Sequence, residues 1–258
     1  IAMLQLTNSE ISDWRQCQRK HWVLHVLKLT MPPRSEPDPD SALQIGIAGH
    51  AAMERWMRDG VKPEMATPRQ QAAVDAAGAV MWRSVEDIES IEQAHLKPLD
   101  GVPGVSIMGK TGVMLYDTLA NGVVPLDYKF SAQPDIRSLR VATQPDHYMT
   151  LTKSRHMLLL VIKHYAKRAE ATIQRVTRTG AQLDSYAHYL RGWAEGIKAA
   201  HDQPAETAPA PNPTRTCSWS CPIASICPDI TNTTTAKSLT IRHGLTPFDP
   251  LARYHEED

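Results

Sequence analysis

The feature that most constrains this chain is a pair of predicted β-strands joined by an Asn-Gly turn. The first strand covers residues 109–117 and the second covers residues 123–130. Asn-Gly between two apolar runs is a strong short-range hairpin signal, because both residues tolerate the positive φ angles of a tight turn. Side chains alternate between the faces of a strand, so Asp127 and Lys129 share one face. Their apolar neighbours occupy the other face and can enter a core.

A carboxylate beside an ammonium group at the rim of a sheet suits metal-assisted hydrolysis. Asp127 would hold a divalent ion, while Lys129 would orient a water molecule and offset developing negative charge. The same two residues are also consistent with an ion pair on a half-buried strand, which is the more frequent situation for such a pair taken alone. Motifs elsewhere in the chain distinguish between these two interpretations.

Length and composition indicate a globular chain. Its 258 residues are 42% hydrophobic and 22% charged, enough for one large domain or two small ones. We find no apolar segment long enough to span a membrane and no secretory signal, so we expect a cytoplasmic protein. The formal net charge is zero, so a nucleic-acid partner would need a local basic patch.

The sequence predicts one domain over residues 1–228, followed by a peripheral tail over residues 229–258. Thr7 and Glu10 have the spacing of a capping box that starts a helix reaching about Leu29. Ser41 caps a second predicted helix, in which Gly46 and Gly49 indicate close approach by another element. The predicted parts are N-terminal helices over 7–88, a sheet core over 89–130, a basic helical region over 140–202, a Pro/Ala linker over 203–216 and a cysteine segment over 217–228.

The strongest concentration of positive charge lies between residues 153 and 178, and we expect a helix to run from about 144 to 165. Basic side chains here are either a solvated helix face or a surface that follows a phosphate backbone. The candidate DNA-binding residues are Lys153, Arg155, Lys163, Lys167 and Arg168.

Four cysteines suggest a metal centre. Cys217, Cys221 and Cys227 are close in sequence, and Cys17 on the first helix could be the fourth ligand. Four thiolates fit a structural zinc ion or a [4Fe-4S] cluster, and the division into one plus three ligands favours the cluster. The alternative is four unrelated cysteines. A shared centre would join the first helix to the C-terminal segment.

These elements, in this order, resemble the iron–sulfur branch of the PD-(D/E)XK nucleases. This RecB-like family includes the CRISPR-associated Cas-four exonucleases, the AddB nuclease domain and many phage exonucleases. The resemblance extends from about Leu6 to Pro228. The matching positions are Cys17, the Gly46-x-x-x-His50 element with Glu54, Asp127-Tyr128-Lys129, the Gln144-x-x-x-Tyr148 element and the three clustered cysteines.

The resemblance implies an α/β fold, with a restriction-endonuclease-like mixed sheet flanked by helices and a four-cysteine cluster joining the two ends. It implies a metal-dependent DNA exonuclease acting on ends or single strands in recombination, repair or phage replication. His50 and Asp127 would bind Mg²⁺ or Mn²⁺, and Lys129 would position the attacking water. Gln144 and Tyr148 would contact DNA or support the lysine. Location would be the bacterial cytoplasm, or the host cytoplasm for a phage protein.

One position departs from the family pattern. The family places a metal-binding aspartate where this chain has Gly112, which has no ligand atom. Asp117 lies an odd number of residues away and should face the opposite side of the sheet; Glu92 or Glu54 could replace the missing ligand. Natural degeneration, an introduced substitution and a shifted ligand all remain open. We therefore expect an impaired nuclease.

Two other functions remain alternatives. One is a catalytically silent DNA-binding or assembly subunit that retains the fold and the cluster, which Gly112 favours. The other is a zinc-stapled binding protein unrelated to nucleases. A homo-oligomer or a recombination or helicase partner is compatible with the sequence but not required by it.

Overall fold

The computed structural model describes residues 3–32, 38–81, 88–202, 207–213, 217 and 221–255. The chain divides into two compact units. Strands β3 (Ile88–Pro98) and β4 (Val105–Asp117) and helix α7 (Gly180–Asp202) each contribute residues to both. Unit 1 consists of Ile1–Arg34, Leu96–Met108 and Ala187–Asp258, and unit 2 of Ser35–His95 and Gly109–Tyr186. The extent of the functional domain, over residues 1–228, stays a prediction.

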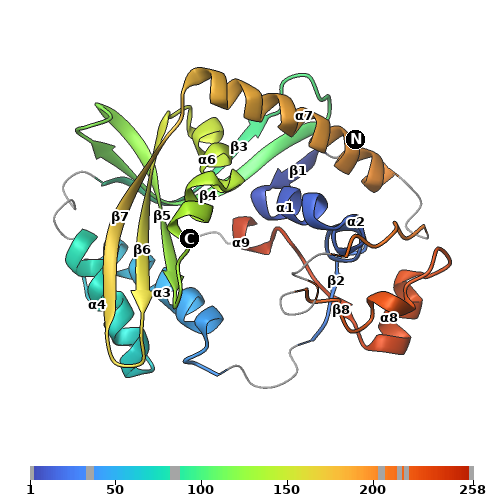
Figure 1. Ribbon diagram of the computed structural model, residues 1–258, viewed down its shortest axis with the longest axis horizontal. Coiled ribbons are helices and arrows are strands. Elements are labelled where there is room, and N and C mark those ends of the chain that lie inside the picture. Colours follow the sequence, from blue (N-terminus) through green and yellow to red (C-terminus); the bar gives the residue numbers. More distant parts are fainter. Residues whose placement is uncertain are drawn as a thin grey trace. The chain divides into compact units, whose positions relative to one another are not determined.

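A mixed sheet is the centre of unit 2 (Figure 1). Strand β5 (Gly122–Ser131) pairs antiparallel with β4 and parallel with β6 (His156–His164). Strand β7 (Ala169–Thr177) pairs antiparallel with β6, and β3 pairs with β4. The parallel connection from β5 to β6 carries the helices α5 (Ile136–Val141) and α6 (Thr143–Thr152). The predicted mixed sheet flanked by helices is confirmed.

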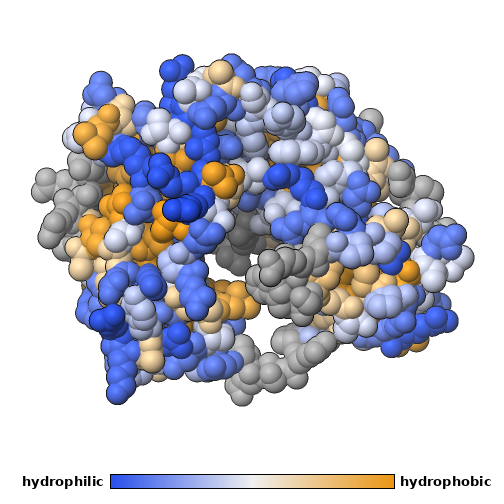
Figure 2. Space-filling view, viewed as in Figure 1, coloured by the Kyte–Doolittle hydropathy of each residue, from blue (hydrophilic) through white to orange (hydrophobic). Residues whose placement is uncertain are grey.

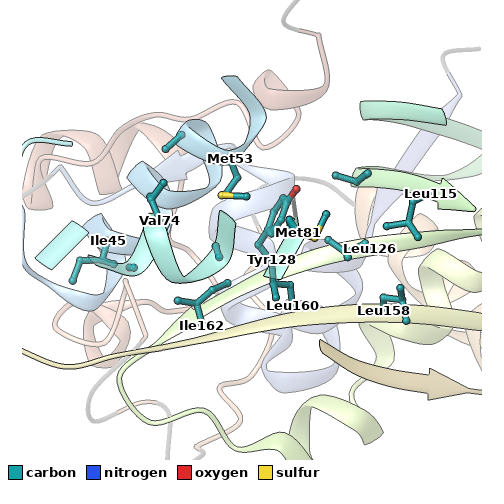
Figure 3. Close-up of a cluster of buried hydrophobic side chains, with 14 of the residues drawn as sticks. Ile45, Met53, Val74, Met81, Leu115, Leu126, Tyr128, Leu158, Leu160 and Ile162 are labelled. Carbon is teal, nitrogen blue, oxygen red and sulfur yellow. The ribbon is translucent and has the colours of Figure 1, made fainter. Parts of the chain in front are cut away.

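Two helices cover one face of this sheet and form the core with it (Figures 1 and 3). Helix α3 (Ala42–Asp59) begins at Ser41, whose hydroxyl accepts a hydrogen bond from the backbone N–H of Gln44 at 3.3 Å, and ends at Gly60 with φ of 70°. Helix α4 (Pro68–Met81) starts at a proline, whose missing N–H costs nothing in the first turn. Core side chains on the helices include Ile45, Met53, Val74 and Met81, and those on the strands include Leu115, Leu126, Tyr128, Leu158, Leu160 and Ile162.

The predicted hairpin is present as β4 and β5. Asn121 takes the left-handed conformation of the turn, with φ of 49°. Pro125 lies opposite Met114 of β4, whereas the ladder between β5 and β6 begins one residue later, at Leu126. The proline therefore occupies a central strand at the point where its missing N–H interrupts no bond to β6.

The predicted helix from 144 to 165 is wrong in its second half. Helix α6 ends at Thr152, and Lys153 takes a left-handed conformation with φ of 56°. Residues 156–164 form β6 instead, and β7 follows, so the predicted basic helical region over 140–202 contains two strands. A continuous apolar run is compatible with a buried strand or a buried helix, and only pairing with β5 and β7 decides between them.

Unit 1 contains both ends of the chain. Strand β1 (Leu4–Thr7) pairs parallel with the first residues of β4. Short elements then alternate, and many of their apolar side chains are buried together, including Trp22, Val23, Ile223 and Ile226. The elements are α1 (Asn8–Gln16), α2 (Gln18–His21), the π-helical turn η1 (Trp22–Val26), β2 (Leu29–Thr30), η4 (Cys227–Asp229), α8 (Ala236–His243), β8 (Thr246–Pro247) and α9 (Ala252–His255).

The first predicted helix is interrupted at Cys17, whose φ of −161° and ψ of 112° are extended values. Segment 229–258, predicted to be a peripheral tail, supplies Leu239 and Leu245 to the buried cluster of unit 1, and β8 pairs with β2. The predicted linker has no regular structure over 207–213, and its other residues lie outside the described part.

The surface in Figure 2 is largely hydrophilic, with an apolar area over β6 and β7. None of the helices in the described residues has both the length and the apolar character required to cross a membrane.

Candidate nuclease site

The carboxylate of Asp127 is the centre of a polar network formed by β5 and α6. Its Oδ2 atom lies 2.6 Å from Nζ of Lys129 and accepts a 3.1 Å hydrogen bond from Nε2 of Gln144. The same Gln144 nitrogen lies 3.4 Å from the hydroxyl oxygen of Tyr148, one helical turn further on. Asp127 is only 6% exposed, so its charge interacts more strongly with its neighbours than it would in water. The structure brings these four predicted residues together.

Glycine at position 109 allows α6 to approach β4 at this place. A Cβ atom at Gly109 would lie 2.6 Å from Leu151 and 2.9 Å from Tyr148. Both distances are far below van der Waals contact, so any larger residue would displace the helix or these side chains. Gly109 therefore helps to set the position of Tyr148 and of the helix that carries Gln144.

The side chain of His50, on α3, lies against two aromatic rings of β5. Its ring centre lies 5.6 Å from that of Tyr128 and 5.7 Å from that of Phe130. These two rings flank Lys129 in the sequence but lie on the opposite face of β5, because side chains alternate along a strand. The preceding residue, Gly49, makes room for Phe130, because a Cβ atom there would lie 2.5 Å from the Phe130 ring. The expected close approach to α3 is confirmed at Gly49, whereas Gly46 faces open space within 4 Å.

Two further carboxylates, those of Glu92 and Glu54, lie close enough to act on the charge of Tyr128 in β5. Burial, together with the negative charges of Glu54 and Asp127, raises the pKa of Glu92 to about 7, against an opposing effect of Lys110. Nζ of Lys110 lies 3.5 Å from Oε2 of Glu92. Burial and the same carboxylates also raise the pKa of Tyr128 well above its ordinary value. Negative charge is therefore concentrated around the Asp127 side of β5.

Glu92 has an unusual backbone conformation, with φ of 49° in the middle of β3. For a residue other than glycine, this left-handed conformation costs free energy and occurs most often where the surrounding structure uses it. Lys110 was not predicted as a site residue. Its partner Glu92 is on another strand, and no local pattern marks such a pair.

Gly112 lies at the place where the family pattern has an aspartate. A Cβ atom at Gly112 would be 3.2 Å from the Tyr128 ring and 3.3 Å from the carbonyl oxygen of Leu126. These contacts are tight but require shifts of only a few tenths of an ångström. Asp117 does not replace the missing ligand, because both of its carboxylate oxygens accept hydrogen bonds from the guanidinium of Arg175 on β7.

The group formed by Asp127, Glu92 and Glu54 has the donor chemistry of a Mg²⁺ or Mn²⁺ site. These hard cations prefer carboxylate oxygens and retain bound waters. Each of these carboxylates also has a cationic partner, Lys129 for Asp127, Lys110 for Glu92 and Arg58 for Glu54. Burial and the neighbouring carboxylates nevertheless raise the pKa of Glu92, and a divalent cation would favour its ionised form. The residues present therefore fit the metal that the family resemblance implies.

The predicted DNA-binding residues fall into two separate groups. Lys153 and Arg155 line a cavity of about 330 Å³ before the start of β6. Lys163, Lys167 and Arg168 lie at the opposite end of β6 and in its turn to β7, with Lys163 and Arg168 over the Tyr165 ring. The structure therefore does not bring them onto one helix face.

The four cysteines are all free and partly buried in unit 1. Burial raises the pKa of Cys221, and the charges of Cys217 and Cys17 add to this effect. Arg19 connects the two ends of the chain, because its Nη1 donates a 2.9 Å hydrogen bond to the carbonyl of Cys227 and lies 3.9 Å from its sulfur. Cys17 and Cys217 are close enough to affect the charge of Cys221, and the Cys227 sulfur lies beside a guanidinium; such thiols could serve as ligands of a thiolate-bound centre.

Comparison with known proteins finds one family model and several solved structures similar to this chain. Residues 5–102 match the family model of the PD-(D/E)XK nuclease superfamily. A solved structure of a candidate exonuclease from Eubacterium rectale has 12% identity and a TM-score of 0.52, with 92% of each chain covered. At this identity the likeness shows the fold alone.

Two further solved structures give weaker matches. An alkaline exonuclease from Laribacter hongkongensis has 11% identity and a TM-score of 0.37, covering 77% of this chain and 90% of its own. A phage-related exonuclease from Haemophilus somnus has 10% identity and a TM-score of 0.37, covering 78% and 95%. No curated protein matches the chain.

Proposed function

We propose, for a chain whose resemblance to the PD-(D/E)XK nuclease superfamily is confirmed by the match over residues 5–102, that it is a divalent-metal-dependent nuclease acting on DNA. The observation that carries this proposal is the pair of Asp127 and Lys129 together with Glu92, whose pKa is raised by burial and by the charges of Glu54 and Asp127. A structural ion pair requires only one carboxylate beside the lysine. Three carboxylates with a strongly raised pKa among them are typical of a functional site.

Glu92 is the carboxylate that we assign to the role of the aspartate missing at position 112. Glu92 is on β3, which pairs with β4, the strand of Gly112. Its pKa responds to the charge of Asp127, and its backbone conformation is strained. Among the alternatives for Gly112, this supports a shifted ligand. His50, Asp127 and Glu92 would hold the ion, and when bound it would lower the pKa of a water molecule and stabilise charge on the phosphate.

The remaining side chains have roles that follow from their contacts. Lys129 would hold the attacking water near the scissile phosphate and offset the charge that develops there. Gln144 would fix the orientation of the Asp127 carboxylate through its 3.1 Å hydrogen bond, and Tyr148 would restrict Gln144 in turn. This arrangement favours a supporting role for the Gln144 and Tyr148 pair over a direct role in binding DNA.

We propose an exonuclease of the RecB-like type, which acts on DNA ends or single strands. The basic cavity with Lys153 and Arg155 is suited to a phosphate backbone, and the group with Lys163, Lys167 and Arg168 could extend this contact. Recombination, repair or phage replication would supply such substrates. Helicase or recombination partners and self-association stay predictions.

A [4Fe-4S] cluster held by Cys17, Cys217, Cys221 and Cys227 is part of this proposal. The division of the ligands into Cys17 and the three cysteines near the C-terminus supports the cluster over a structural zinc ion, which usually has two Cys-x-x-Cys-like pairs.

The test is cleavage of three DNA substrates by the full chain with Mn²⁺ or Mg²⁺: a linear duplex, a single strand and a covalently closed circle. We expect release of nucleotides from the linear substrates and none from the circle. Asp127→Asn and Lys129→Ala should each reduce the rate by roughly 100- to 1,000-fold, while the exposed control Lys237→Ala should not. Wild-type rates in both site variants would contradict the proposal.

The second candidate function is a silent DNA-binding subunit, which the absence of a ligand atom at Gly112 favours. In that case no metal ion would support cleavage, although linear DNA would still bind. Filter binding with the same three substrates separates the two functions, since the nuclease must both bind and cut.

A further inference from the structure

A second cluster of metal-ligating side chains lies in unit 1, and the nuclease proposal does not use it. Glu10 of α1, His21 of α2 and His201 of α7 place their ligand atoms within 4.8 Å of one another. Oε1 of Glu10 lies 3.0 Å from Nε2 of His21 and 2.9 Å from Nε2 of His201. The two histidines are in opposite parts of the sequence, so only the fold brings them together.

The side chain of Glu10 does not make the hydrogen bond that its capping-box pattern predicts. In a capping box its carboxylate would accept from the backbone N–H at Thr7. Only the other half of the box is confirmed, because the hydroxyl of Thr7 accepts a 3.1 Å hydrogen bond from the N–H of Glu10. The Glu10 carboxylate points instead to the two imidazoles, and the residue is 4% exposed.

The spacing of these three atoms is close to that of a first-row metal site. Nitrogen and oxygen ligands about 2.0–2.2 Å from a tetrahedral zinc ion lie about 3.4 Å from one another. The observed distances of 3.0 and 2.9 Å require a widening of only a few tenths of an ångström. Two imidazoles and one carboxylate also form a donor set used by zinc and by non-haem iron, with a position left open.

The surrounding residues hold the ligands in place. The His21 ring lies between the edge of Trp14, 5.1 Å away, and the stacked ring of His25, 5.3 Å away. Trp14 in turn fits against Gly196 of α7, where a Cβ atom would be 2.9 Å from the indole. This contact sets the register of α7 against α1, and so fixes His201 relative to Glu10. A metal site requires such orientation by outer residues.

Glu10 and His21 both have pKa values shifted from their ordinary range. Although burial opposes it, hydrogen bonds from His201 and His21 help to lower the pKa of Glu10 to about 2, so it is ionised at neutral pH. Burial lowers the pKa of His21, which favours the neutral imidazole. Metal binding would move each Nε2 proton to Nδ1. In the described structure Nδ1 of His21 is buried and has no hydrogen-bond partner. It therefore stays unpaired whether the proton is on Nε2 or has moved to Nδ1.

An ion could enter from a cavity of about 830 Å³, which His201 lines together with Glu195 and Asp202. Lys198 also lines this cavity and pairs with Asp202 at 2.7 Å, so Glu195 is the acidic side chain that would attract an entering cation. We propose that Glu10, His21 and His201 form a binding site for Zn²⁺ or a similar divalent transition-metal ion, separate from both the nuclease site and the cysteines. The bound ion would connect α1 and α2 to the C-terminal end of α7.

The test is Zn²⁺ binding to the full chain, prepared without oxygen so that any cysteine-bound centre stays loaded, and measured by competition with a chromophoric chelator. Glu10→Gln is the key variant, because its amide oxygen still accepts hydrogen bonds from both histidines but is a poor metal ligand. We expect one Zn²⁺ per wild-type chain beyond any cysteine-bound metal. Glu10→Gln and His201→Ala should bind about 100-fold more weakly or worse, since even outer partners contribute 10- to 100-fold.

His188→Gln is the matched control, because His188 is exposed on the same helix. It should bind Zn²⁺ like the wild type. Added Zn²⁺ at about 100 times its dissociation constant should raise the Tm of the wild type and of His188→Gln by roughly 5 °C, and should leave Glu10→Gln unchanged. Absence of a Zn²⁺ site in the wild type, or equal affinity in Glu10→Gln, would show that the cluster is only a hydrogen-bonded one.

Discussion

Gln144 donates a 3.1 Å hydrogen bond to Oδ2 of Asp127, the oxygen that also lies 2.6 Å from Nζ of Lys129. Oδ2 of Asp127 therefore has two partners. Lys129 is on the same strand, β5, and Gln144 is on α6, in the connection between β5 and β6. This leaves Oδ1 as the Asp127 oxygen without either of these two partners. The relationship makes Gln144 a positioning residue whose loss should affect the rate more than DNA binding.

The first prediction concerns this hydrogen bond. Gln144→Ala should lower kcat by roughly 10- to 100-fold with little change in KM, because a hydrogen bond to a charged group contributes about 1.5–3 kcal/mol. Gln133→Ala, an exposed residue in the loop after β5, should behave like the wild type. A raised KM with unchanged kcat would instead mean that Gln144 contacts DNA.

The second prediction concerns Glu92, whose pKa is raised from 4.5 to about 7. Between these two values the folded chain holds a proton that the unfolded chain has released. The free energy of unfolding should therefore fall as pH rises from about 4.5 to 7 in the absence of divalent ions. Glu92→Gln should lose this contribution, and Glu89→Gln, an exposed position on the same strand, should keep it.

Denaturant unfolding at a series of pH values measures this effect. Mn²⁺ should restore stability to the wild type at pH 7–8, because the cation replaces the proton among the carboxylates. The assignment would fail if Glu92→Gln showed the same pH dependence as the wild type.

The third prediction uses the two glycines of α3. Gly49→Ala should destabilise the chain by about 1–3 kcal/mol, since its Cβ atom would enter the Phe130 ring that His50 contacts. Gly46→Ala has open space and should stabilise the helix by about 0.5–1 kcal/mol. Thermal unfolding and cleavage rates should distinguish the two variants: Gly49→Ala should have a lower Tm and a lower rate, and Gly46→Ala should keep the wild-type rate. Equal behaviour would mean that Phe130 moves freely.

The fourth prediction concerns the cysteines. Protein purified without oxygen should be brown, and Cys17→Ala, Cys221→Ala and Cys227→Ala should each lose the colour and aggregate. Loss of the same absorption band in every variant would show that one centre joins both ends of unit 1. A colourless protein with one zinc bound through cysteine would favour the zinc alternative, and metal analysis of Glu10→Gln separates that ion from one at Glu10.

Local patterns predicted the elements that carry their own signals. Asn121 before Gly122 marked the hairpin, and Ser41 marked the start of α3. Each of these two signals is contained in a few neighbouring residues, which explains why sequence alone was sufficient. The order of Asp127, Lys129, Gln144 and Tyr148 in the family pattern indicated the polar network that the structure brings together.

Long-range partners decided the rest. The run from Met157 to Ile162 is apolar throughout, and pairing with β5 and β7 made the segment from His156 to His164 a strand. Glu10 has the spacing of a capping-box residue, but its carboxylate pairs with His21 and His201, which are far apart in the sequence. The pair of Glu92 and Lys110 likewise depends on the packing of β3 beside β4. No short window contains such information.

The central claim is that Glu92 does the work of the aspartate missing at position 112, and the most direct test is an exchange of carboxylates. Mn²⁺-dependent cleavage of a linear duplex should be compared in the wild type, Glu92→Gln, Gly112→Asp and the variant with both changes. The tight but adjustable space around Gly112 should allow the aspartate to fold in.

We predict that the wild type cuts, that Glu92→Gln loses roughly 100-fold or more of the rate, and that adding Gly112→Asp to Glu92→Gln restores a substantial part of it. Cleavage by Glu92→Gln at the wild-type rate would contradict the account, as would an inactive wild type that Gly112→Asp alone makes active.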